Sequence, residues 1–140
     1  MDNLAYLFIK SSRLLKGVLD KRLASYHVTA AQFSVLNQIA MQNGQVTLVQ
    51  IAEKLGSDRP TISVIINRLE RNGLIEKIAH PQDKRSAFLK IKAEHLAFVA
   101  ELRVVSEQVN QEIFSGLTAS ESKQLASVLQ TLIQTVDDLG

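Results

Sequence analysis

The sequence contains no cysteine and no tryptophan, and its aromatic residues are only five Phe and two Tyr. The absence of cysteine excludes disulfides, thiolate zinc sites, iron–sulfur clusters and a cysteine nucleophile or redox sensor. No apolar run approaches the roughly 20 residues of a transmembrane helix. The first residues mix charges into an amphipathic pattern, unlike the solid apolar block of a signal peptide. We therefore expect a cytoplasmic protein with no membrane partner.

The length and hydrophobic content of the chain are sufficient for one folded domain. The chain has 140 residues, 46% of them hydrophobic, and a chain of this length buries roughly two-thirds of its unfolded surface. Internal repeats, low-complexity stretches and linkers are lacking. We therefore expect a single domain over residues 1–140.

Charge is distributed unevenly along the chain. Residues 1–45 hold five Lys/Arg against two Asp/Glu, residues 46–92 hold nine against five, and residues 93–140 hold two against seven. A basic middle beside an acidic C-terminal third fits one surface for a polyanion and another kept away from it. Ordinary solvated faces would give the same asymmetry, so the charge pattern alone does not distinguish a polyanion-binding surface from a solvated one.

Apolar residues spaced by threes and fours predict helices over most of the chain. A first helix of about six turns covers 4–23, and a long helical pattern runs from 93 to about 115. Helix starts are marked by capping boxes, in which a Thr and a Gln or Glu three residues later satisfy each other's backbone N–H groups. These boxes are Thr29 with Gln32, Thr47 with Gln50, and Thr118 with Glu121.

The middle of the chain predicts a helix-turn-helix followed by a β-hairpin, called a wing. A short helix at 47–55 ends at Gly56, and a second begins at Ser57 or Asp58, with Pro60 tolerated in its first turn. The hairpin spans 74–92, and its turn, His80-Pro-Gln-Asp-Lys-Arg85, places two basic side chains at the end of a stiff ribbon. Such a tip suits an adjacent minor groove.

The second of these helices keeps an apolar stripe inward and presents hydrogen-bonding side chains suited to phosphates and base edges. A short polar helix facing solvent would have the same pattern, but the basic wing favours DNA. From the helix, the expected DNA-binding residues are Ser57, Asp58, Arg59, Pro60, Thr61, Ser63, Asn67, Arg68 and Arg71, and from the wing Lys77, Asp83, Lys84 and Arg85. We assign Arg59, Thr61 and Ser63 to base edges or the phosphates flanking them. Arg68, Arg71 and Lys77 are assigned to backbone positioning or to salt bridges within the lobe.

These residues resemble the MarR family of bacterial transcriptional regulators. The resemblance is carried by TAAQFSVL at 29–36, TLVQIAEKL at 47–55, DRPTISVIINRLERNGLI at 58–75 and DKRS at 83–86. It spans nearly the whole chain. Two departures are the Ile91-Lys-Ala-Glu-His95 segment, which lacks the usual helix cap, and Lys77, where the family commonly has arginine.

The resemblance implies a mainly α fold with a small β-hairpin wing. A winged helix-turn-helix lobe over about 29–92 is then flanked by N- and C-terminal dimerisation helices, about 2–24 and 93–139. It also implies a homodimer on a pseudo-palindromic operator, with Arg85 in the minor groove and Asp83 holding the wing in place. The expected function is double-stranded DNA binding by a repressor that a small-molecule effector relieves.

Other interpretations are weaker. The three histidines, His27, His80 and His95, lack the close spacing of metal-ligand motifs, so we expect no metal and no cofactor. Tyr6 and Tyr26 would line an effector pocket between the N-terminal helix and the winged lobe, or serve only as core residues. Glycine-rich phosphate loops and nucleophile elbows are lacking, so no enzyme activity is expected. A protein-interaction module and a double-stranded-RNA-binding protein remain alternatives.

Overall fold

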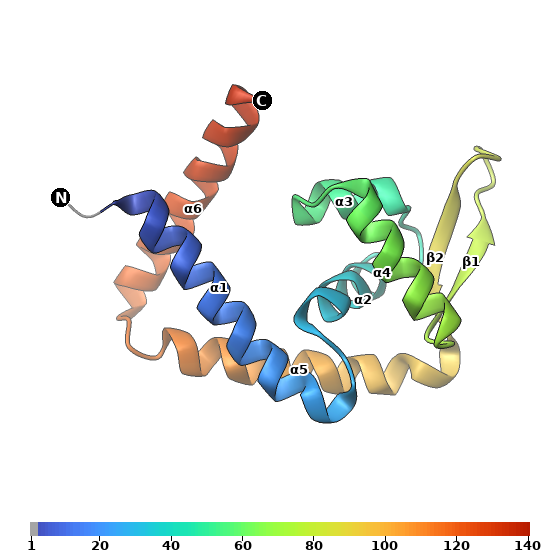
Figure 1. Cartoon of the computed structure of the whole chain (residues 1–140), viewed down its shortest axis with the longest axis horizontal. Helices are drawn as coiled ribbons and strands as arrows, with labels where there is room; N and C mark the ends of the chain where they lie inside the picture. Colours follow the sequence, from blue (N-terminus) through green and yellow to red (C-terminus); the bar gives the residue numbers. More distant parts are fainter. Residues whose placement is uncertain (1–2) are drawn as a thin grey trace. The chain divides into compact units, whose positions relative to one another are not determined.

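The computed structural model describes residues 3–140, so residue 2 of the expected first dimerisation helix lies outside the described residues. The fold is mainly α-helical with one two-stranded antiparallel hairpin, which confirms the predicted fold class (Figure 1). The elements are α1 (Leu4–Leu23), the 3-10 turn η1 (Ala24–Tyr26), α2 (Ala30–Met41), α3 (Leu48–Leu55), α4 (Arg59–Arg71), β1 (Ile75–Ala79), β2 (Ala87–Ile91), the 3-10 turn η2 (Ala93–His95), α5 (Leu96–Phe114) and α6 (Ala119–Leu139).

The chain forms two compact units whose boundary falls within α5. The first unit extends to Ser106 and the second is Glu107–Gly140. The first contains the helix-turn-helix, the hairpin and a common apolar core. The second contains the end of α5 and the whole of α6.

All three predicted capping boxes are present. The hydroxyl of Thr29 accepts from the N–H of Gln32, whose side chain accepts in return from the N–H of Thr29. Thr47 and Gln50 start α3 in the same way. The box at Thr118 starts α6. Local sequence therefore fixes where these three helices begin.

The core of the first unit lies between α2, α3, α4, the hairpin and the start of α5. Its largest fully buried side chains include Leu36, Ile39, Ile51, Ile62, Ile66, Leu69, Ile75, Leu89 and Leu102. Ile62, Ile66 and Leu69 form the expected inward stripe of α4, and burial of each such side chain stabilises the lobe by about 1.5–3 kcal/mol. The outward face of α4 is thereby fixed.

Two side-chain hydrogen bonds within the first unit connect helices far apart in sequence. Asp20 of α1 accepts from the backbone N–H of Ala30 at 2.6 Å, at the first turn of α2. A carboxylate at a helix N-terminus also complements the helix dipole. Arg103 of α5 donates through Nε to Oδ1 of Asn37 in α2 at 3.1 Å.

The hairpin is anchored at its base and free at its tip. Ile75 pairs with Ile91 and Ala79 with Ala87, and the N–H of Leu89 donates to the carbonyl of Val46 at 2.9 Å. Ile75, Leu89 and Ile91 are buried, whereas β1 beyond Ile75 is exposed. Figure 1 shows the tip extending away from the start of α5.

The start of α5 differs from the simple helix expected from residue 93. Residues Ala93–His95 form a 3-10 turn, and the α-helix begins at Leu96. Lys92, which precedes the turn, provides no side-chain cap. Without a capping side chain the first turn tightens to i→i+3 hydrogen bonding, which satisfies backbone groups at a helix end.

Candidate nucleic-acid interface

The turn between α3 and α4 is short because both of its ends are capped locally. Gly56 ends α3 in the left-handed region with φ 64°, and its N–H bonds back to Ala52 and Glu53 carbonyls. Two residues later, Oδ1 of Asp58 accepts from the N–H of Thr61 at 2.8 Å and starts α4. This gives the helix-turn-helix geometry that the sequence predicted.

Asp58, expected among the DNA-binding residues, is the N-cap of α4. The hydrogen bond from the Thr61 backbone lowers the pKa of the Asp58 carboxyl below its ordinary range, and the Thr61 hydroxyl adds to the effect. A lowered pKa means that the cap stabilises the fold above the range where a free aspartate titrates. The contribution is lost as the pH falls through the lowered pKa.

The outward face of α4 and the two residues before it carry the helix side chains expected to contact DNA. Ser63 is half-buried, whereas the exposed members of the set are Ser57, Asp58, Arg59, Pro60, Thr61, Asn67, Arg68 and Arg71. Arg59, Thr61 and Ser63 lie in the first turns of the helix, and Arg68 and Arg71 lie in its last. The side chains of the first turns are thus accessible to a DNA groove, and the side chains of Arg68 and Arg71 are accessible to phosphates further along the helix.

Lys77 of β1 is held against α4. Its Nζ lies 3.5 Å from Oε1 of Glu70 and 3.5 Å from Oδ1 of Asn67. Glu70 is therefore paired with Lys77, and Asp58 accepts from the backbone of Thr61; within residues 3–140 neither acid is found in an ion pair with Arg68. Lys77 therefore makes the salt bridge within the lobe, and Arg68 stays available for a phosphate.

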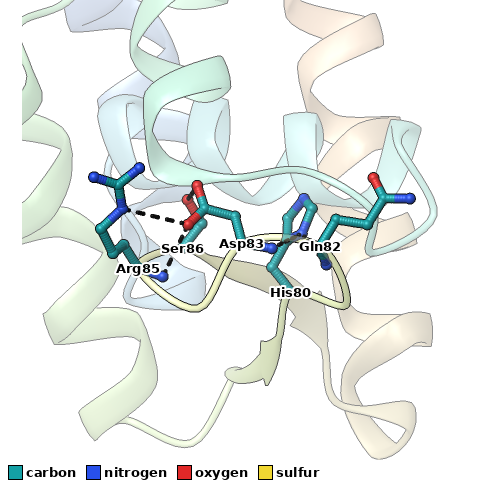
Figure 2. Close-up of polar contacts among 5 residues, drawn as sticks. All are labelled: His80, Gln82, Asp83, Arg85 and Ser86. Carbon is teal, nitrogen blue, oxygen red and sulfur yellow. Dashed lines mark hydrogen bonds and ion pairs between the residues drawn. The ribbon is translucent and has the colours of Figure 1, made fainter.

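The wing tip is organised around Asp83 (Figure 2). Its Oδ1 accepts from the N–H of Arg85 at 3.0 Å and lies 3.6 Å from Nε of the same residue, while Oδ2 accepts from the hydroxyl of Ser86. The N–H of Arg85 is the main cause of the lowered pKa of Asp83. The Arg85 side chain remains 94% exposed, so it is oriented but not covered. Lys84 beside it is also exposed.

His80 is a wing residue that the sequence analysis did not select. Its Nδ1 accepts from the backbone N–H groups of Gln82 and Asp83, both at 3.1 Å, and its ring centroid lies 4.4 Å from that of Phe88. A histidine opening a tight turn just before a proline is the only sequence signal of this role. That signal does not show which atoms the imidazole contacts.

The described residues contain no group of three or more His, Asp or Glu side chains placed to hold a metal ion. His27 adopts a left-handed conformation after η1, and His95 ends η2. Helices α1 to α6, as described from residue 3 onward, include none long and apolar enough to cross a membrane.

The two tyrosines lie in different surroundings. Tyr26 is half-buried against Phe98, with ring centroids 6.2 Å apart, whereas Tyr6 is 57% exposed and has Nζ of Lys10 above its ring. A separate open crevice of about 410 Å³ lies between the end of α2, the end of β2 and the start of α5. Its lining includes Ile39, Ile91, Leu96, Val99, Lys90 and Arg103.

Comparison with known proteins agrees with this geometry. Residues 27–86 match the model of the MarR family. A cysteine-to-serine mutant of MarR from E. coli, complexed with operator DNA, is 27% identical with a TM-score of 0.83, and the match covers 92% of this chain and 92% of that chain. Wild-type apo MarR from E. coli is 26% identical with a TM-score of 0.76, over 94% of this chain and 98% of that chain. The S. aureus MepR–DNA complex is 24% identical with a TM-score of 0.87, over 96% and 99%.

The fold of residues 29–92, with α4 and the hairpin beside it, is a winged helix-turn-helix. The winged-helix lobe matches the model of the MarR family, as the sequence resemblance predicted, and the chain has the fold of MarR-family transcriptional regulators. Members of this family are regulators of transcription and not enzymes.

Proposed function

We propose that this chain is a homodimeric repressor that binds a pseudo-palindromic operator in double-stranded DNA and is released by a small-molecule effector. The observation that carries the proposal is the wing tip, where Asp83 orients an Arg85 side chain that is 94% exposed. An exposed cation on a stiff ribbon beside a polar helix face suits insertion into a minor groove next to the major groove that α4 enters. A DNA-binding role places the protein in the cytoplasm.

Dimerisation is proposed from two exposed apolar surfaces. In α1, Leu4, Leu7, Phe8, Leu14 and Val18 are exposed, and in α6, Leu125, Val128, Leu132, Ile133, Val136 and Leu139 are exposed. Contiguous apolar surface of this kind mainly marks protein interfaces. We therefore retain α1 and the segment from α5 to α6 as dimerisation helices that flank the lobe at 29–92 in a single domain.

For the effector we propose the crevice at the end of α2 and the start of α5 as the binding site. The crevice beside Lys90 and Arg103 combines apolar side chains with two cations, a lining that suits a small amphipathic anion. It lies at the base of the wing, where an occupant would contact β2 directly. Tyr6 and Tyr26 do not line it, so the effector pocket expected between the N-terminal helix and the lobe is a separate proposal.

A competition experiment separates the proposed function from the two alternatives. Labelled duplex DNA bound by the purified protein is challenged with unlabelled duplex DNA and with duplex RNA of the same sequence. We expect DNA to compete at least tenfold better than RNA. Equal competition would favour the RNA-binding alternative, and a failure to bind either duplex at about 100 mM salt would favour a protein-interaction module.

We expect Thr61→Ala and Ser63→Ala to relax sequence preference at one symmetric pair of operator positions each, because both side chains lie in the first turns of α4. Arg68→Ala is the matched control. It should weaken binding to all sequences and reduce the slope of log affinity against log salt by about two per dimer. If both hydroxyl variants kept wild-type preference and affinity, α4 would not be the sequence-reading element.

Mild peroxide is expected to leave DNA binding unchanged, because the chain has no thiol to form a sulfenic acid. The accessible sulfur of the described residues is Met41, which is 58% exposed with its thioether 3.5 Å from Nδ2 of Asn37. The other methionine, Met1, lies outside them. Binding measured before and after treatment tests the expectation, and a loss that Met41→Leu prevents would reveal a methionine switch instead.

A further inference from the structure

The turn at the wing tip is closed by the imidazole of His80. Its Nδ1 accepts from two successive backbone N–H groups, those of Gln82 and Asp83, each at 3.1 Å (Figure 2). The ring is half-buried and packs on Phe88 of β2, with 4.4 Å between ring centroids. A single side-chain atom thus fixes the backbone that leads into Asp83.

This arrangement requires a neutral imidazole. Nδ1 can accept only when it carries no hydrogen, so the ring proton is on Nε2. An imidazolium carries hydrogens on both nitrogens and only donates. Protonation therefore replaces two hydrogen bonds by three donors facing one another, and imidazoles take up this proton between about pH 5 and 8.

Protonation of His80 would affect Arg85 through Asp83, because Asp83 contacts both the turn and Arg85. The carboxylate of Asp83 orients Arg85 through the backbone N–H at 3.0 Å and Nε at 3.6 Å. A positive charge on His80 would also attract the Asp83 carboxylate, an attraction that, after the hydrogen bond from the Arg85 N–H, helps to lower the pKa of Asp83. An imidazolium would therefore compete with Arg85 for this carboxylate. The other charges of the turn, Lys84 and Arg85, are exposed, and the contact from β2 is the uncharged Phe88.

We propose that His80 is a positioning residue for the wing: its neutral imidazole sets Asp83 and Arg85 for DNA, and protonation releases the wing and weakens binding. The proposal rests on the proposed entry of Arg85 into DNA. It assigns to His80 a role distinct from direct DNA contact, and it makes operator binding sensitive to protonation of this imidazole.

Operator binding at pH 7.5 and pH 5.5 tests the proposal, with a duplex selected from a random library by the wild-type protein as the probe. His80→Ala should bind about tenfold more weakly at pH 7.5, because it removes the acceptor of two backbone hydrogen bonds in each wing. His80→Asn should stay within about threefold of wild type, because its Oδ1 occupies the topological position of Nδ1 and accepts without titrating.

The pH profile distinguishes positioning from simple packing. The wild-type protein and the control variant His95→Asn, changed outside the wing, should both lose affinity by about tenfold between pH 7.5 and 5.5. His80→Asn should lose much less. Wild-type affinity in His80→Ala, or an equal acid loss in His80→Asn and wild type, would overturn the proposal.

A measurement without DNA separates this proposal from the proposed function. NMR signals of the Gln82 and Asp83 amides in the free wild-type protein should shift with pH in step with the His80 ring signals. Amides that do not follow the ring would contradict the role of His80 even if the wing binds DNA. If the amides follow the ring but Arg85→Ala binds DNA normally, the proposed function of the wing is wrong and the role of His80 in the turn stands.

Discussion

Replacing Arg85 with alanine is expected to cost each operator half-site about 1–3 kcal/mol, since it removes a side chain that we propose to insert into the minor groove. A dimer carries two wings, so the operator affinity should fall by a factor of roughly 30 to more than 10⁴. The fold should be unaffected, because the side chain is 94% exposed and its recorded partner, Asp83, belongs to the same turn. Titration of a labelled operator at physiological salt measures the change.

Lys84→Ala is the matched control for Arg85→Ala. Lys84 is an exposed cation of the same turn. Among the described contacts, the Asp83 carboxylate accepts from the backbone N–H of Arg85 but not from that of Lys84. Removal of the Lys84 side chain should therefore cost affinity equally on operator and random DNA, by a phosphate contact alone. If Arg85→Ala lost affinity equally on operator and random DNA, Arg85 would be a phosphate contact like Lys84. Unchanged affinity in Arg85→Ala would mean that Arg85 does not contact DNA.

Leu132→Asp is expected to dissociate the proposed dimer. Leu132 lies on the apolar face of α6 and is 44% exposed in the single chain, so an aspartate there would lose its hydration only when a partner covers it. Burying such a polar group without a partner costs at least about 2 kcal/mol per protomer, or about a thousandfold in dimer affinity for two copies. Sedimentation at micromolar concentration should then show a monomer, and operator binding should fail with it.

Gln130→Asp introduces the same charge at an exposed polar position of α6, and it should leave the dimer intact. Leu129→Asp should also weaken the proposed dimer, since Leu129 is half-buried on this helix. A well-folded monomeric wild-type protein that bound operator tightly would contradict the dimer proposal. So would a Leu132→Asp variant that sediments as a dimer.

The parts of the fold that depend on local chemistry were predictable from the sequence. Thr29, Thr47 and Thr118 cap helices with partners three residues away, and Gly56 adopts the left-handed conformation that a tight turn requires. The apolar period of α4 likewise fixed which side faces the core, and hence which residues could face DNA.

The contacts that depend on residues distant in sequence were not predictable. Nothing local indicates that Asp20 caps α2, or that Arg103 reaches Asn37 across 66 residues. Lys77 was expected either at the DNA backbone or in a salt bridge, and only the packing of β1 beside α4 selects Glu70. The role of His80 depends on the direction of one ring atom, which no periodicity or spacing encodes.

The central claim is that a dimer of this chain recognises a pseudo-palindromic duplex through α4 and the wing. Selection from a random duplex DNA library with the purified full chain, followed by sequencing of the bound fragments, tests it most directly. We expect enrichment of two inverted half-sites whose centres lie about one helical turn apart, roughly 10 base pairs. Enrichment of a single half-site without its inverted copy, or no enrichment above the starting library, would contradict the account.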